Sequence, residues 1–267
     1  MPDKIGILFL GDIIGRPGRK ALKQYLPRLI EKYSPSLIIA NAENAAGGIG
    51  ITEKVAQELF SQVNVLTSGN HIWDKKEAIE YIEREKRLLR PANFPPLNPG
   101  RGSFLFEDEK GIKIGILNLQ GRVFMEPIDC PFRTADREIA LMRESTSLIV
   151  VDFHAEATSE KQAMGWYLDG RVSAVIGTHT HVPTADERIL PQGTAYITDV
   201  GMIGGYNSII GIRREHALDR FLLARTQRLE PSKDGLIFGA LAVEIDRWTG
   251  RALGIEREVI KVEKNEV

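Results

Sequence analysis

The sequence has little cysteine and almost no net charge, and both absences exclude classes of protein. Cys130 is the only cysteine in 267 residues, so an internal disulfide is impossible and a reducing compartment is the simpler expectation. The 35 lysines and arginines nearly balance 36 aspartates and glutamates, for a formal net charge of −1. Long nucleic acid usually requires a basic face that displaces counterions. We therefore expect no duplex nucleic acid as a partner, and a small anionic substrate is favoured.

The sequence also lacks long apolar runs. No run approaches the about 20 apolar residues that span a bilayer, and the first apolar stretch, 5–10, is too short for a signal peptide and leads straight to Asp12. No linker rich in serine, glycine or proline, no repeat and no low-complexity tract interrupts the chain. Length alone leaves one domain as likely as two. These absences favour a single domain over residues 1–267, located in the cytoplasm and without membrane contact, and they leave a homo-oligomer open.

Short aliphatic segments alternate with amphipathic ones, which is the pattern of an α/β protein. The expected strands are 5–10, 37–40, 63–67, 104–107, 112–119, 148–153, 172–176, 194–198, 236–245 and 254–262. The expected helices are 19–33, 52–62, 75–87, 135–145, 159–169 and 214–225. Thr52 is expected to cap the second helix, because its side-chain oxygen can accept a hydrogen bond from the first turn. Periodicity alone supports only the class α/β.

Side chains that bind metal ions follow five of these strands. They are Asp12, Glu43, Asn44, Asn70, His154, His179 and His181. Because open α/β sheets gather their loops in a crevice beyond the carboxyl ends of the strands, we expect these side chains to converge in space. Asp12 and Asn70 could instead cap turns, and His154 alone would more often be a hydrogen-bonded core histidine. The joint arrangement favours a metal site.

The segment 177–181 carries two histidines, and these suggest two metal ions. In extended chain His179 and His181 would point to the same side, with Cα atoms about 6 to 7 Å apart. This spacing fits one histidine on each of two metals about 3.5 to 4 Å apart, with Glu43 as the bridging carboxylate. The other ligands divide into Asp12 and Asn44 with His181, and Asn70 and His154 with His179. Mixed oxygen and nitrogen ligands suit iron or manganese, with zinc left open.

Other residues could bind a phosphate group. Arg16, Arg19 and Arg122 have forked donors that match phosphate oxygens, and the pair Gly47-Gly48 could present backbone N–H groups to an anion. Arginines near helix starts and in loops are, however, usually solvent-facing, and the two glycines could simply allow a tight turn. Both interpretations stay open at this point.

Five ordered motifs resemble those of the calcineurin-like metallophosphoesterases. They are Gly11-Asp12, Asn41-Ala-Glu43-Asn44, Gly69-Asn70-His71, His154 and Gly177-Thr-His179-Thr-His181. More narrowly, the segments 11–18, 41–48, 70–74, 90–93 and 199–202 resemble the bacterial YmdB branch of that superfamily, and the match runs over nearly the whole chain. The resemblance implies a four-layer α/β/β/α sandwich in which two mixed sheets face each other. It also implies activity on 2′,3′-cyclic nucleotides.

The chain departs from the wider superfamily at two positions. Ile14 stands where most members have a histidine ligand two residues after the first aspartate, and Ile14 cannot coordinate a metal. Asn44 could supply the missing donor. Glu43 stands where the superfamily usually has a bridging aspartate. Both departures are features of the YmdB branch, so they sharpen the assignment.

The resemblance also implies a reaction. A dinuclear centre can lower the pKa of a bridging water, place the hydroxide in line with phosphorus and neutralise the transition state. The position of His71 is similar to that of the family's general acid, which would protonate the leaving alkoxide. The expected substrates are 2′,3′-cyclic nucleotides or RNA ends, and the product is a 3′-phosphate. A dinuclear phosphomonoesterase or nuclease, and a non-catalytic nucleotide-sensing protein, remain the alternatives.

Overall fold

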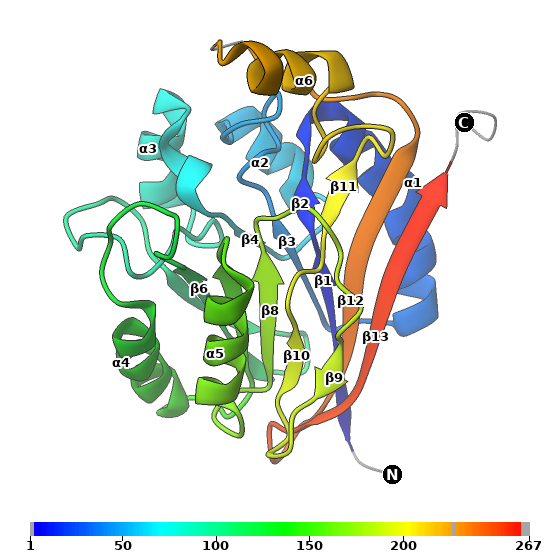
Figure 1. The fold of residues 1–267 in the computed structure, drawn as a ribbon. Helices are drawn as coiled ribbons and strands as arrows, with labels where there is room; N and C mark the ends of the chain where they lie inside the picture. Colours follow the sequence, from blue (N-terminus) through cyan, green and yellow to red (C-terminus); the bar gives the residue numbers. More distant parts are fainter. Residues whose placement is uncertain (1–2, 226–227, 263–267) are drawn as a thin grey trace.

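The computed structural model of the chain describes residues 3–225 and 228–262. These residues form a mixed α/β fold that contains two β-sheets (Figure 1). The predicted class is therefore confirmed. No helix in these two described ranges is both long enough and apolar enough to cross a membrane.

The larger sheet carries the N-terminal strand near its centre. Its strand order is β2, β11, β12, β1, β3 and β4, and β13 also pairs with β12. These strands are β1 (Lys4–Leu10), β2 (Asp12–Ile13), β3 (Leu37–Asn41), β4 (Val65–Thr67), β11 (Met202–Gly204), β12 (Leu236–Asp246) and β13 (Ala252–Val262). Strands β1, β3 and β4 run parallel, so their carboxyl ends lie at one edge of the sheet.

The smaller sheet contains a second set of parallel strands. Its order is β5, β6, β7, β8, β10 and β9. These strands are β5 (Ser103–Glu107), β6 (Lys113–Gln120), β7 (Ile149–His154), β8 (Ala174–Thr178), β9 (Arg188–Ile189) and β10 (Ala195–Ile197). Strands β6, β7, β8 and β10 run parallel to one another.

Two apolar clusters pack helices against the sheets, and a third lies between the sheets. The helices of the described residues are α1 (Gly15–Tyr33), α2 (Glu53–Phe60), the 3-10 helix η1 (Asn70–Trp73), α3 (Lys76–Arg84), α4 (Pro131–Arg143), α5 (Thr158–Leu168) and α6 (Arg214–Leu223). One cluster joins α1, α2 and α3 to the larger sheet, a second lies between residues of the two sheets, and a third joins α4 and α5 to the smaller sheet. Along β1, Leu8 and Leu10 belong to the first cluster, whereas Ile7 and Phe9 belong to the second. Side chains of this strand therefore alternate between two buried faces.

The predicted strands and helices are all present, within a few residues of their expected ends. Helix α1 begins at Gly15 rather than at residue 19, because Pro17 lies in the first turn, where no backbone N–H is needed. The predicted cap of α2 is confirmed, since the Val55 N–H donates to Thr52 Oγ1 at 3.3 Å. The short elements β2, β9, β11 and η1 were not predicted, because two to four residues are too few to show a period.

Candidate metal centre

All seven side chains that were expected to bind metals lie at or just beyond the carboxyl ends of parallel strands from both sheets. The structure places Asp12 after β1, Glu43 and Asn44 after β3, Asn70 after β4, His154 at the end of β7, and His179 and His181 after β8. Asp12, Glu43, Asn44 and His154 are buried, and the other three are half-buried. The expected convergence of these side chains is what the structure shows. Their role as ligands stays a prediction.

The Glu43 carboxylate lies at the centre of this cluster. Its Oε1 is 3.0 Å from Asn44 Nδ2 and 3.1 Å from His154 Nε2. Its Oε2 accepts a hydrogen bond from the backbone N–H of His71 at 3.1 Å. Glu43 therefore contacts one residue from each of the two expected ligand sets, as a bridging carboxylate would.

The first set gathers around Asp12. His181 Nε2 is 3.8 Å from Asp12 Oδ1 and 3.3 Å from Asn44 Nδ2. Asp12 Oδ1 is buried and has no hydrogen-bond partner among the described residues. A buried carboxylate oxygen without a partner is costly, so a cation beside Asp12 fits the residues that are present.

The second set gathers around His154 Nε2. Three potential ligand atoms surround this nitrogen, namely His179 Nδ1 at 3.0 Å, Glu43 Oε1 at 3.1 Å and Asn70 Oδ1 at 3.2 Å. The ligand atoms of Glu43, His154 and His179 all lie within 4.8 Å of one another. One proton on Nε2 cannot serve three acceptors at once, whereas a metal ion can bind all of these groups.

A neighbouring hydrogen bond determines which nitrogen His154 presents. Its Nδ1 lies 2.9 Å from Thr178 Oγ1, and that hydroxyl donates its own proton to Asp152 Oδ1 at 2.7 Å. Thr178 must therefore accept from the Nδ1–H of His154. In the neutral ring this leaves the lone pair on Nε2, facing the cluster, as a metal ligand requires.

The other two histidines are held in the same way. His179 Nε2 is 3.2 Å from Glu156 Oε2, which leaves Nδ1 toward His154. His181 Nδ1 is 2.8 Å from the carbonyl oxygen of Ile210, which leaves Nε2 toward Asn44. Such partners behind a histidine fix its tautomer and orientation. Each of the three rings thus presents one free nitrogen to the centre.

Several ionisable groups of this cluster have shifted pKa values, because they are buried close to one another. Burial raises the pKa of Asp12 to about 6, against the opposing effect of His181 and His154. Burial also opposes ionisation of Glu43, but the charge of His154 and its hydrogen bond lower the pKa of Glu43 to about 2. Burial alone would lower the pKa of His154, but Glu43 and Asp12 raise it to about 9. Burial and the charge of His154 lower the pKa of His179 to about 3. A proton on His154 therefore offsets the buried carboxylates, and a metal ion could replace it.

The prediction that His179 and His181 lie in extended chain was wrong. Their φ angles are 98° and 65°, in the left-handed region. Strand β8 ends at Thr178, and the backbone turns sharply after it. This turn, and not the geometry of an extended strand, directs the two rings toward different ligand sets. Positive φ costs free energy in residues other than glycine and often marks functional sites.

A buried ion pair that the sequence analysis did not identify holds this turn. Lys161 Nζ on α5 donates to the carbonyl oxygen of Thr178 at 2.7 Å and to Asp199 Oδ2 at 2.6 Å. The same Asp199 oxygen accepts from the backbone N–H of Thr180 at 3.1 Å. Both charged side chains are 1% exposed. The pair therefore fixes the backbone on both sides of His179.

Removing one member of this pair should strongly destabilise the fold. We expect Lys161→Met to lower the free energy of unfolding by about 3 to 5 kcal/mol, because it leaves Asp199 as a buried charge without its partner. Urea unfolding of the metal-free protein measures this. The double variant Lys161→Met with Asp199→Asn should recover part of the loss. A change below about 1 kcal/mol in the single variant would contradict the assigned role.

His71 lies beside the cluster and has a partner of its own. Its Nδ1 is 2.6 Å from Asp74 Oδ2, so Nε2 is the ring nitrogen left for a substrate. Both residues belong to the segment 70–74, which resembles the YmdB branch, and this was the signal that could have identified Asp74. Glu156 and Lys161 gave no such signal, since single charged residues usually lie in solvent.

The three arginines differ in what they can still bind. Arg19 donates to the carbonyl oxygen of Ala45 at 2.6 Å and to Glu58 Oε2 at 2.9 Å, so its forked donors are engaged within the protein. Arg16 and Arg122 are exposed. Of these three arginines, Arg16 and Arg122 could still offer a free guanidinium to a phosphate group.

Comparison with known proteins gives one consistent family. A family model described as "YmdB-like protein" matches residues 8–258. The chain is 49% identical over 255 residues to the 2′,3′-cyclic-nucleotide 2′-phosphodiesterase of Bacillus subtilis (strain 168), covering 95% of this chain and 96% of that protein. It is also 40% identical over 273 residues to a putative phosphatase/phosphodiesterase of Mycoplasma pneumoniae, covering 98% and 94%.

Two solved structures are similar over almost their full length. A hypothetical protein from Thermus thermophilus superposes with a TM-score of 0.89 at 42% identity, covering 97% of this chain and 100% of that one. A phosphatase from Mycoplasma pneumoniae superposes with a TM-score of 0.91 at 39% identity, covering 98% and 95%. The two-sheet α/β fold is therefore shared with a structure described as a phosphatase.

Proposed function

The chain belongs to the YmdB-like protein family, and we propose that it is a metal-dependent phosphodiesterase that hydrolyses 2′,3′-cyclic nucleotides to 3′-nucleotides. The observation that carries this proposal is the buried cluster around Glu43, in which ring nitrogens and carboxylate oxygens face one another. The name of the Bacillus subtilis relative supplies the substrate class.

The proposed centre would hold two metal ions, iron or manganese, with zinc left open by the donor set. Asp12, Asn44 and His181 would hold one ion, Asn70, His154 and His179 would hold the other, and Glu43 would be shared by both. Bound metal ions would supply Lewis acidity and lower the pKa of a water molecule. We further propose that the three apolar clusters build a four-layer α/β/β/α sandwich of one domain. A cytoplasmic location remains a prediction from the sequence.

His71 is proposed as the general acid. Hydrolysis adds a water oxygen to phosphorus, breaks the bond between phosphorus and the 2′ oxygen, and requires a proton on that departing oxygen. The Asp74 carboxylate holds His71 Nδ1, which leaves Nε2–H of the protonated ring to donate that proton. The backbone N–H of His71 also contacts Glu43, so the ring is positioned next to the cluster without having to bind a metal.

A substrate panel tests the proposed reaction. With Mn²⁺ or iron present, we expect kcat/KM for 2′,3′-cyclic AMP to exceed that for 3′,5′-cyclic AMP and for phosphomonoesters by at least about tenfold, or about 1.4 kcal/mol of transition-state stabilisation. Chromatography of the product should show 3′-AMP. A preference for monoesters would favour the phosphomonoesterase, and nucleotide binding without turnover would favour a sensing protein.

A further inference from the structure

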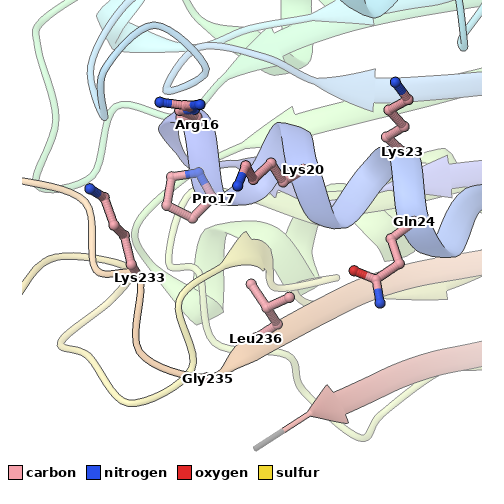
Figure 2. Close-up of a pocket in the computed structure, with 8 residues that line it drawn as sticks. All are labelled: Arg16, Pro17, Lys20, Lys23, Gln24, Lys233, Gly235 and Leu236. Atoms are coloured by element: carbon pink, nitrogen blue, oxygen red, sulfur yellow. The ribbon is translucent and has the colours of Figure 1, made fainter. Parts of the chain in front are cut away.

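A basic groove runs along the first helix, outside the candidate metal centre. It has a volume of about 640 Å³ and lies between α1 and the start of β12 (Figure 2). Arg16, Lys20 and Lys23 are spaced by four and three residues, so they share one face of α1 and extend over about 10 Å of its axis. Lys233 lies across from the start of the helix (Figure 2). The groove therefore carries a row of cations.

Among the residues that the structure describes, no acidic side chain lines this groove. In the part of the chain that the structure describes, none of the ion pairs involves Arg16, Lys20, Lys23 or Lys233. An adjacent cavity of about 290 Å³ shares Lys233 with the groove, and there Lys233 and two arginines are mixed with the carboxylates Glu215, Glu230 and Asp234. Since the whole chain has a net charge of only −1, the groove is a local concentration of positive charge. Clustered cations attract anions, and they repel one another until bound anions neutralise them.

The groove begins next to the candidate metal centre. The first residue of α1, Gly15, donates its backbone N–H to the carbonyl oxygen of the proposed ligand Asn44 at 2.9 Å. Arg16 is the next residue, and it is four residues after the proposed ligand Asp12. Fully extended chain of that length spans at most about 14 Å. A ligand in the metal centre could therefore continue into the groove if it is longer than a single nucleotide.

The residues that line the groove also indicate which kind of anion would fit. Pro17 and Leu236 form an apolar part of the groove between the cations, which suits a sugar or base between successive phosphates. A cyclic mononucleotide has one phosphate, which the metal centre would hold, and it would leave these cations without a partner. A single-stranded nucleic acid brings one phosphate per nucleotide along a line.

We propose that this groove binds the backbone phosphates of a short single-stranded RNA whose terminal 2′,3′-cyclic phosphate occupies the metal centre. The inference rests on the proposed function and narrows its substrate class. Lys20, Lys23 and Lys233 each contact a phosphate upstream of the end. The reaction at the terminal phosphate is unchanged, and the groove adds affinity for the strand.

The test compares two substrates and two variants. The substrates are 2′,3′-cyclic AMP and an RNA of about five nucleotides that ends in a 2′,3′-cyclic phosphate. The groove variant is Lys20→Gln, Lys23→Gln and Lys233→Gln together. The control, Lys110→Gln with Lys113→Gln, removes two exposed lysines, one just before β6 and one at its first residue. Circular dichroism and thermal unfolding check that both variants fold.

The wild-type protein should prefer the RNA by at least about tenfold in kcat/KM at low salt, and the groove variant should lose that preference through KM. Its kcat/KM for 2′,3′-cyclic AMP should change less than about twofold. Because each phosphate contact on a single strand contributes about −0.7 to the slope of log affinity against log salt, the variant should flatten that slope by about 2. The control should behave as wild type.

If the wild type and the groove variant have equal kcat/KM for the RNA, the groove proposal is overturned. Turnover of 2′,3′-cyclic AMP would still uphold the proposed function. If neither substrate is turned over, the proposed function fails, and binding of the same RNA with a 3′-phosphate end then decides about the groove. Fluorescence anisotropy should show weaker binding by the groove variant. Equal binding of this RNA by the wild type and the groove variant would reject the groove proposal.

Discussion

Glu43→Ala is expected to remove both metal ions from the protein and to lower kcat by about 10²- to 10³-fold, the usual effect of losing one key electrostatic contact. Glu43 contacts both ligand sets, through Asn44 Nδ2 at 3.0 Å and His154 Nε2 at 3.1 Å. Its removal also takes away the negative charge that both ions would share. Elemental analysis of the purified protein measures the first effect, and steady-state kinetics measures the second.

Single histidine variants provide the comparison. His179→Ala and His181→Ala should each lose chiefly one ion, because the two rings face different ligand sets. Glu43→Gln keeps the size of the side chain, so it separates loss of charge from loss of packing. Glu77→Gln, which changes an exposed carboxylate on α3, should leave the metal content unchanged. Near-stoichiometric metal in Glu43→Ala and in both histidine variants would refute the centre as proposed.

The class and order of the helices and strands could be predicted because the local pattern of apolar and polar residues agrees with the fold. The aliphatic run at 5–10 is strand β1, and its residues Leu8 and Phe9 face two different apolar clusters. Strand β11 could not be found in the same way. It owes its place to pairing with β2 and β12, which are far from it in sequence. Such pairing leaves no periodic signal in three residues.

The site was predictable to the extent that it depends on strand ends. Polar residues after parallel strands of one sheet must meet at one edge, and this is enough to bring Asp12 and Glu43 together. His154 ends β7 of the smaller sheet, so its contact with Glu43 depends on how the two sheets pack against each other. The groups behind the ligands could not be predicted. Ile210 holds His181 through a backbone carbonyl, which has no signature in sequence. The turn at His179 depends on Lys161, whose charge is buried only through tertiary packing.

His71→Ala is expected to keep both metals and the fold, while kcat on 2′,3′-cyclic AMP falls by about 10² to 10⁴, the usual contribution of positioned proton transfer. The side chain of His71 is not among the atoms that face one another around Glu43, and only its backbone N–H contacts that carboxylate. Loss of the ring should therefore leave the metal content unchanged. Elemental analysis and kinetics on the same preparation measure both quantities.

The leaving group separates proton donation from a structural role. Bis(p-nitrophenyl) phosphate releases a weakly basic phenolate that needs little protonation, so His71→Ala should slow its hydrolysis much less than that of 2′,3′-cyclic AMP. Asp74 only holds the ring through Nδ1, and Asp74→Asn should accordingly cost less, about 10- to 100-fold, as partners behind a functional histidine usually do. If His71→Ala slows both esters equally, His71 does not protonate the leaving oxygen, and the contact between Glu43 and its backbone N–H becomes its main contribution to the site.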